Sequence, residues 1–181
     1  MDSRLSDPIL GKIVIRILVA LGLVAHAWPA HADEGSIEAL KARTDGVYIL
    51  EEWHKDGQVY RPPQVEGRFV LLNGVIMTIL HNKMQPPNEI TVVVIGRYTL
   101  DSAKFSYGYD NTSIFTEGPS GITVSHKPLF EGLRNFAVNS EGDIVRMRSE
   151  TGQQELLFDA SGSTYSENGK PLRVWRRTTE R

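Results

Sequence analysis

The stretch EGRFVLLNGVIMTILH, residues 66–81, decides the fold class of this chain. Two apolar runs flank Asn73-Gly74, a dipeptide that favours a type I′ turn because both of its central residues can take positive φ. We expect strands at 66–72 and 75–81, joined as a hairpin. Short strands separated by glycine turns continue on both sides of this hairpin.

The remaining predicted strands are also short and separated by turns. We expect them at 47–54, 90–100, 104–109, 122–126, 134–138, 144–149, 153–158 and 172–177. Even spacing of short strands favours a closed sheet, because closure removes exposed edges. The sequence therefore predicts an all-β fold, a single antiparallel up-and-down β-barrel of about 8–10 strands.

Two segments outside these strands complete the predicted fold. A short N-terminal helix is expected at 36–43, capped by Ser36 and lying across one end of the barrel. The stretch 111–121 is expected to be an irregular loop at the barrel mouth.

The first 32 residues have the pattern of a secretory signal peptide. Basic residues come before an apolar stretch at 17–25, and small residues flank a cleavage site before Asp33. The apolar stretch is shorter than the roughly 20 residues of a membrane span, although an uncleaved anchor is the alternative. We expect a signal peptide at 1–32, a barrel domain at 33–181, a periplasmic or secreted location and no stable membrane span after cleavage.

Composition excludes several classes of function. The 181 residues include no cysteine, which rules out disulfides and thiol catalysis. The net charge is −2 and no basic run occurs, so nucleic acid is not an expected partner. There is no Gly-x-Ser-x-Gly motif, and His54, His81 and His126 are far apart. We expect no serine hydrolase, no metal site and no cofactor.

Alternation along each strand predicts which side chains face the interior. On one strand Phe105, Tyr107 and Tyr109 share a face that we expect to point inward. Val75, Met77 and Ile79 are expected inward on another strand, which turns His81 inward as well. In the same way Ile122 and Val124 bring His126 inside, and Phe136 and Val138 bring Arg134 inside.

Five side chains are therefore candidates for lining an interior site: His81, Tyr107, Tyr109, His126 and Arg134. Buried polar groups need partners, so several of them in one barrel predict a polar-lined cavity. Arg134 could hold a carboxylate through two parallel bonds, and His126 could move a proton near neutral pH. These side chains suit an amphipathic acid as ligand. The alternative is that each one lies at a strand end and reaches water.

Short motifs in this chain resemble the lipocalin-like (calycin-type) barrel domains of bacteria. Asp45-Gly46-Val47-Tyr48 resembles the Gly-x-Trp start of such barrels, with Tyr48 in place of the tryptophan, and Val174-Trp175-Arg176-Arg177 resembles their aromatic-plus-arginine end. Residues 65–69 and 73–77 add to the likeness. The resemblance implies a cavity for a small apolar molecule, and it implies that Arg173 or Arg176 stacks on a ring of the first strand. Allene oxide cyclase-like barrels share the same general shape.

Three functions fit these patterns. The first is an exported barrel that binds a small apolar or amphipathic acid ligand. The second is a cofactor-free isomerase or cyclase of the allene oxide cyclase-like type. The third is a non-catalytic accessory protein of the cell envelope with a filled barrel. We favour the first, with a small molecule as partner, and an oligomer is compatible with each.

Overall fold

The structure is a computed structural model that describes residues 34–178, with side chains from residue 37 onward. The predicted signal peptide and its cleavage site lie outside this range. One helix, α1 (Glu34–Thr44), precedes twelve strands in the described range. No helix in this range is both long and apolar enough to cross a membrane.

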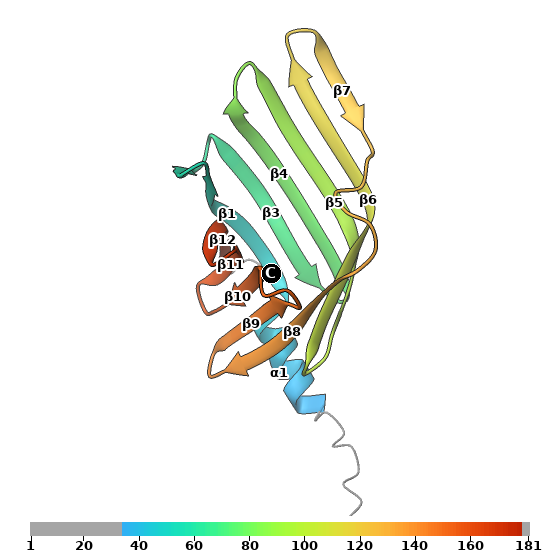
Figure 1. The fold of residues 1–181 in the computed structure, drawn as a ribbon, viewed down its shortest axis with the longest axis vertical. Helices are drawn as coiled ribbons and strands as arrows, with labels where there is room; N and C mark the ends of the chain where they lie inside the picture. The colour runs from blue at the N-terminus through green and yellow to red at the C-terminus, as the bar shows by residue number, and fades with distance from the viewer. Residues whose placement is uncertain (1–33, 179–181) are drawn as a thin grey trace, which may run out of the picture. The chain divides into compact units, whose positions relative to one another are not determined.

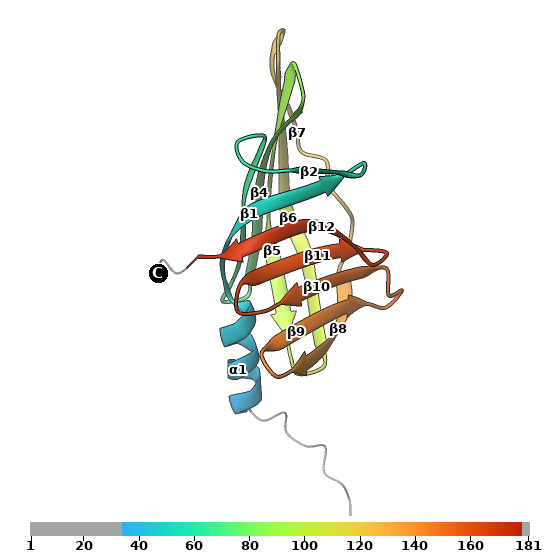
Figure 2. The same ribbon diagram turned by 90° about the vertical axis from the view of Figure 1, so that its left-hand side faces the viewer.

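Ten of the strands form a closed antiparallel barrel (Figures 1 and 2). The strands are β1 (Gly46–Lys55), β2 (Gln58–Tyr60), β3 (Val65–Leu72), β4 (Val75–Gln85), β5 (Asn88–Leu100), β6 (Lys104–Gly118), β7 (Gly121–Ser125), β8 (Arg134–Glu141), β9 (Ile144–Ser149), β10 (Gln154–Phe158), β11 (Gly162–Glu167) and β12 (Lys170–Arg177). The order around the barrel is β1-β3-β4-β5-β6-β8-β9-β10-β11-β12, and β12 pairs back to β1. β2 pairs with β1, and β7 pairs with β6. The predicted fold class is confirmed.

The hairpin at residues 66–81 is also confirmed. Asn73 and Gly74 have φ angles of 51° and 81°, as a type I′ turn requires. Strands β3 and β4 pair on both sides of this turn in continuous register, from Leu72 opposite Val75 to Val65 opposite Asn82.

The long strands β4, β5 and β6 correct the sequence prediction most. The stretch 111–121, predicted as a loop, forms the second half of β6 and the turn into β7, so that prediction is wrong. Its polar residues resemble a loop, but their backbone groups pair with β5. Figure 1 shows β4 to β7 extending past the other strands at the end away from α1. We call this projecting part the overhang, residues 82–91 and 113–125.

Two smaller differences concern elements that carry weak apolar signals. The sequence pattern does not predict β2 or β11, because β2 is only three residues long and β11 is mostly polar. Helix α1 begins at Glu34, so Ser36 lies inside the helix and does not cap it.

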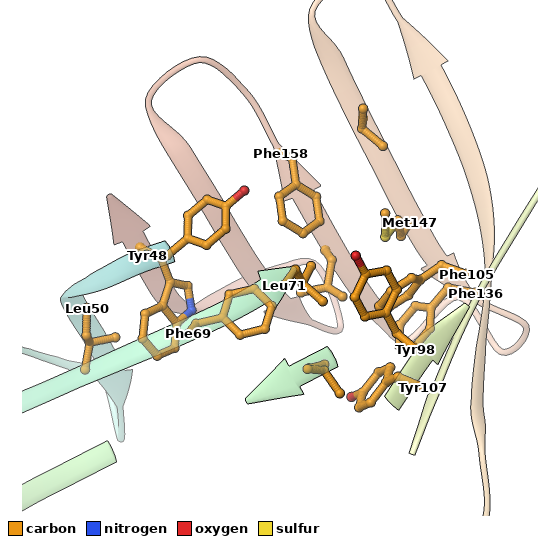
Figure 3. Close-up of a cluster of buried hydrophobic side chains, with 14 of the residues drawn as sticks. Tyr48, Leu50, Phe69, Leu71, Tyr98, Phe105, Tyr107, Phe136, Met147 and Phe158 are labelled. Carbon is orange, nitrogen blue, oxygen red and sulfur yellow. The ribbon is translucent and has the colours of Figure 1, made fainter. Parts of the chain in front are cut away.

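One end of the barrel, the closed end, is covered by α1 and filled with side chains (Figure 3). Tyr48, Phe105, Phe136, Phe158 and Met147 are all buried to within 1% of full burial there. The hydroxyl of Tyr48 donates to the carbonyl of Thr44 at the end of α1, 2.7 Å away. Burial raises the pKa of Tyr48 to about 12, so this hydroxyl keeps its proton.

Candidate ligand-binding site

A cavity of about 270 Å³ occupies the other half of the barrel, which we call the open end. Six aromatic rings line it: Phe69, Tyr107, Tyr109, Phe130, Tyr165 and Trp175. A barrel of this size can either fill its interior or hold one small ligand. This barrel has a packed closed end and a hollow open end.

The cavity has two different walls. Its charged lining residues are Arg134 on β8, Glu167 on β11 and Arg173 on β12. Strands β4 and β5 contribute only uncharged residues to the lining: Ile76, Thr78, Leu80, Val92 and Val94. An amphipathic molecule therefore meets a cationic wall and an aliphatic wall in one space.

Arg173 is the most unusual group in the cavity. Its guanidinium lies over the ring of Trp53, 4.6 Å from the ring centre, and 5.8 Å from the ring centre of Tyr165. Its Nε atom is buried and has no hydrogen-bond partner among the described residues. Burial lowers the pKa of Arg173, although a guanidinium stays charged in proteins. A buried cationic donor without an acceptor has a desolvation cost. An anion bound next to Arg173 would offset part of this cost.

Arg134 supplies a second cation to the lining, from β8, four strands away from Arg173 on β12. Its guanidinium lies 3.9 Å from the ring centre of Phe130, in the connection between β7 and β8. Phe130 also packs edge-on against Tyr107 and tilted against Tyr109, with ring centres 5.7 Å and 5.2 Å apart. Within residues 37–178, neither Arg134 nor Arg173 forms an ion pair with a carboxylate.

The tyrosines of the cavity are neutral hydrogen-bonding groups. Burial raises the pKa of Tyr107, against a smaller opposing effect of Arg134. Burial raises the pKa of Tyr109 to about 12. Burial also raises the pKa of Tyr165, and its hydroxyl donates to the carboxylate of Glu167. All three hydroxyls therefore stay protonated at neutral pH.

Three of the five predicted site residues come together at the cavity. Tyr107, Tyr109 and Arg134 line it, and their predicted inward orientation is confirmed. The register explains this, since Tyr107 on β6 pairs directly with Arg134 on β8. Their role in ligand binding stays a prediction.

The predicted inward orientation of His81 is wrong. On β4 the side chains of Ile76, Thr78 and Leu80 face the cavity, so His81 lies on the outer face. Its ring contacts Thr91 Oγ1 at 2.8 Å and Glu89 Oε2 at 3.0 Å. Both faces of β4 carry apolar residues, so alternation alone does not select the inner face.

The predicted inward orientation of His126 is also wrong. It follows β7, a strand of the overhang that lies outside the ring of ten, where Ile122 and Val124 are 65% and 50% exposed. His126 is exposed, and its Nδ1 lies 3.2 Å from Ser113 Oγ. Among the described side chains, no group of three or more His, Asp or Glu residues could hold a metal ion.

Sequence reasoning missed Tyr165, Glu167 and the cavity position of Arg173. Arg173 has the same strand parity as Trp175, which is buried, and this parity is a signal that could have placed it inside. Tyr165 and Glu167 lie on β11, which has too few apolar residues to be recognised as a strand.

The family resemblance implies that Arg173 or Arg176 stacks on a ring of the first strand, and Arg173 does so. Arg173 stacks on Trp53 of β1 rather than on Tyr48. Arg176 lies outside the barrel and donates to Glu51, 2.9 Å away. Comparisons with protein-family models, with curated proteins and with solved structures each gave no match. The closed barrel is compatible with a lipocalin-like fold, and this compatibility rests on its topology.

Proposed function

We propose that the barrel binds a small amphipathic acid in the cavity of its open end. The ligand carboxylate lies between Arg134 and Arg173, and the apolar part lies against the rings and the aliphatic wall. One observation carries this proposal: Arg134 and Arg173 both line the cavity and neither pairs with a carboxylate within residues 37–178, while the buried Nε of Arg173 has no acceptor among the described residues.

The energetics favour an anion at this place. A carboxylate accepts two parallel hydrogen bonds from a guanidinium, and such charge-assisted bonds are stronger than neutral ones. Desolvation of Arg173 is a cost that the fold already carries, and a bound carboxylate would offset it. The two stacked aromatic partners, Trp53 and Phe130, hold the guanidiniums in position before any ligand arrives.

The cavity gives less support to the isomerase alternative. None of His54, His81 and His126 lines it. Its tyrosines have raised pKa values and keep their protons, so they are poor bases. A fully filled barrel, the third alternative, is not supported either, since about 270 Å³ of the open end is hollow. Binding without catalysis is therefore the function that we favour.

We propose further that the protein is an exported barrel of the lipocalin-like class. The closed topology, the helix over one end and an arginine of β12 stacked on a β1 ring support this class. The export proposal rests on the sequence of residues 1–32. N-terminal sequencing of protein recovered from the periplasm or medium tests it. A chain that stays whole in the cytoplasm would contradict it.

Isothermal titration with octanoate and with its neutral methyl ester tests the binding proposal. We expect octanoate to bind and the ester to bind more weakly, because only octanoate can pair with the guanidiniums. Arg173→Gln and Arg134→Gln should each weaken octanoate binding about tenfold or more, the effect of losing a hydrogen bond to a charged group.

Arg176→Gln is the matched control. Arg176 lies on the same strand as Arg173 but outside the barrel, so its replacement should leave octanoate affinity unchanged. Melting temperatures of all three variants show whether each is folded. Equal affinity for octanoate in the native protein and in folded Arg173→Gln would contradict the proposal.

A further inference from the structure

The hollow part of the barrel is small. An apolar cavity of about 150 Å³ accepts benzene, so about 270 Å³ has room for one ring or a medium-length chain together with a carboxylate. A long hydrocarbon chain needs more space than this, so it cannot be buried whole while its carboxylate lies between Arg134 and Arg173.

The floor of the cavity blocks any extension toward the closed end. Ile76, near the start of β4, is the β4 lining residue nearest to that end, and it is buried. Phe69, which lies on β3 opposite Thr78, packs on Tyr48, with ring centres 5.6 Å apart. Toward the closed end the interior is filled by buried residues that include Tyr48, Phe105, Phe136, Met147 and Phe158 (Figure 3). A chain that enters head-first or tail-first therefore stops at this floor.

The charges of the cavity match a single negative charge. Two guanidiniums and one carboxylate, that of Glu167, line it. Glu167 is held by the hydroxyl of Tyr165, so its position is fixed near the mouth. In the proposed function the first carboxylate of the ligand occupies both guanidiniums. A second carboxylate would then lie next to either Glu167 or the uncharged residues of β4 and β5. Glu167 repels it, and the uncharged residues cannot solvate it.

We infer that the cavity selects compact monoanions: the filled floor beneath Ile76 rejects long-chain acids, and Glu167 together with the aliphatic wall rejects dianions. This inference rests on the proposed function, because it describes the same site. It names the class of ligand as monocarboxylates with one ring or a medium-length chain.

Competition titrations with four carboxylates test this selectivity. Octanoate and 4-phenylbutyrate are the compact monoanions, dodecanoate is the longer monoanion, and octanedioate is the dianion matched in length to octanoate. We expect dodecanoate and octanedioate each to bind at least about tenfold more weakly than octanoate. The extra methylenes of the first do not fit the cavity, and burial of the second carboxylate of the other is costly.

Two variants locate the cause of each preference. Ile76→Ala should deepen the floor and narrow the affinity gap between dodecanoate and octanoate. Leu156→Ala, on another strand of the same cavity, serves if Ile76→Ala does not fold. Glu167→Gln keeps an acceptor for Tyr165 and should narrow the gap between octanedioate and octanoate, without changing the preference for chain length.

Each outcome separates the two proposals. Tighter binding of dodecanoate than octanoate would overturn the length limit and leave the proposed function standing. Equal binding of octanedioate and octanoate would overturn the charge limit in the same way. If none of the four acids binds the native protein, the proposed function fails, and the selectivity fails with it.

Discussion

The two ends of the barrel are built from similar residues, but they differ in how their polar groups are satisfied. At the closed end, Arg177 donates hydrogen bonds to the carbonyls of Ala42, Arg43 and Asp45. At the open end, Arg173 on the same strand has a buried Nε without a partner in the described range. One strand therefore carries an arginine whose donors are used within the fold and an arginine that, in the proposed function, pairs with a ligand.

The two arginines differ because helix α1 covers the closed end and supplies carbonyl acceptors there. Helix α1 places its last carbonyls beside Arg177 and Tyr48, so the polar ends of these two side chains are hydrogen-bonded. At the open end the strands of the overhang extend past the barrel (Figure 1), and Phe130, between β7 and β8, lines the cavity. The closed end therefore gains packing energy, while the open end keeps space for a ligand.

The largest expected effect is the loss of a ring from the closed end. Phe105→Ala should lower the free energy of unfolding by about 3–5 kcal/mol, because Phe105 is fully buried and the site cannot collapse. Phe130→Ala, at the open end, should cost less, because Phe130 is only partly buried. Urea denaturation measures both. Equal costs would show that the two ends are packed alike.

The two ends of the barrel each have an Asn-Gly turn, and these turns can be compared directly. Asn73-Gly74 lies at the closed end and Asn168-Gly169 at the open end, and their glycines have φ angles of 81° and 73°. Gly74→Val and Gly169→Val should each cost about 1–3 kcal/mol, because a β-branched residue is strained at positive φ. Octanoate affinity of the folded protein should change only in Gly169→Val, which follows Glu167 closely. A changed affinity in Gly74→Val would contradict the separation of the two ends.

A smaller effect, of opposite sign, is expected at Arg173. Arg173→Met should leave the free energy of unfolding unchanged or raise it by about 1 kcal/mol, because a poorly compensated buried charge is replaced by an apolar side chain. Arg177→Met should instead lower it by about 1–3 kcal/mol, because three carbonyls lose their donor. Thermal and urea unfolding measure both variants. A large loss in Arg173→Met would make Arg173 a structural residue.

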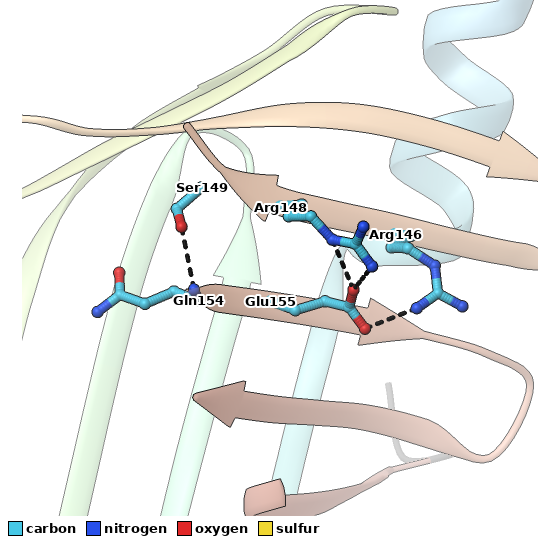
Figure 4. Close-up of polar contacts among 5 residues, drawn as sticks. All are labelled: Arg146, Arg148, Ser149, Gln154 and Glu155. Carbon is cyan, nitrogen blue, oxygen red and sulfur yellow. Dashed lines mark hydrogen bonds and ion pairs between the residues drawn. The ribbon is translucent and has the colours of Figure 1, made fainter. Parts of the chain in front are cut away.

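The smallest effect is expected on the outer surface, which belongs to neither end. Burial alone would raise the pKa of Glu155, but hydrogen bonds from Arg148 and Arg146, at 2.6 Å each, hold it below its usual value (Figure 4). A carboxyl group with a lowered pKa stabilises the fold above its unfolded pKa, and this contribution disappears as the pH falls through the folded pKa.

Glu155→Gln should therefore cost less than about 1 kcal/mol at neutral pH, since both arginines are partly exposed. The difference from the native protein should shrink to zero in acid, below the folded pKa of Glu155. Urea unfolding at a series of pH values measures it. A difference that persists or grows in acid would show that the packing of Glu155, rather than its charge, matters.

The barrel fold and the inward orientation of Tyr107, Tyr109 and Arg134 could be predicted from local sequence patterns. Asn73-Gly74 specifies its turn because few residues accept positive φ, and this is a local property of the backbone. On β6 one face carries Phe105, Tyr107 and Tyr109 and the other is polar or glycine, so alternation gives the correct inner face. Three of the five predicted site residues followed from such one-sided strands.

The positions of His81, His126 and Arg173 depend on contacts between strands that are distant in the sequence. On β4 both faces are apolar, so the inner face depends on pairing with β3 and β5, and His81 was misplaced for that reason. His126 was misplaced because the position of β7 outside the barrel depends on the length of β6. The surroundings of Arg173 consist of rings that β1 and β11 bring to it, and no local stretch of sequence records such contacts between distant strands.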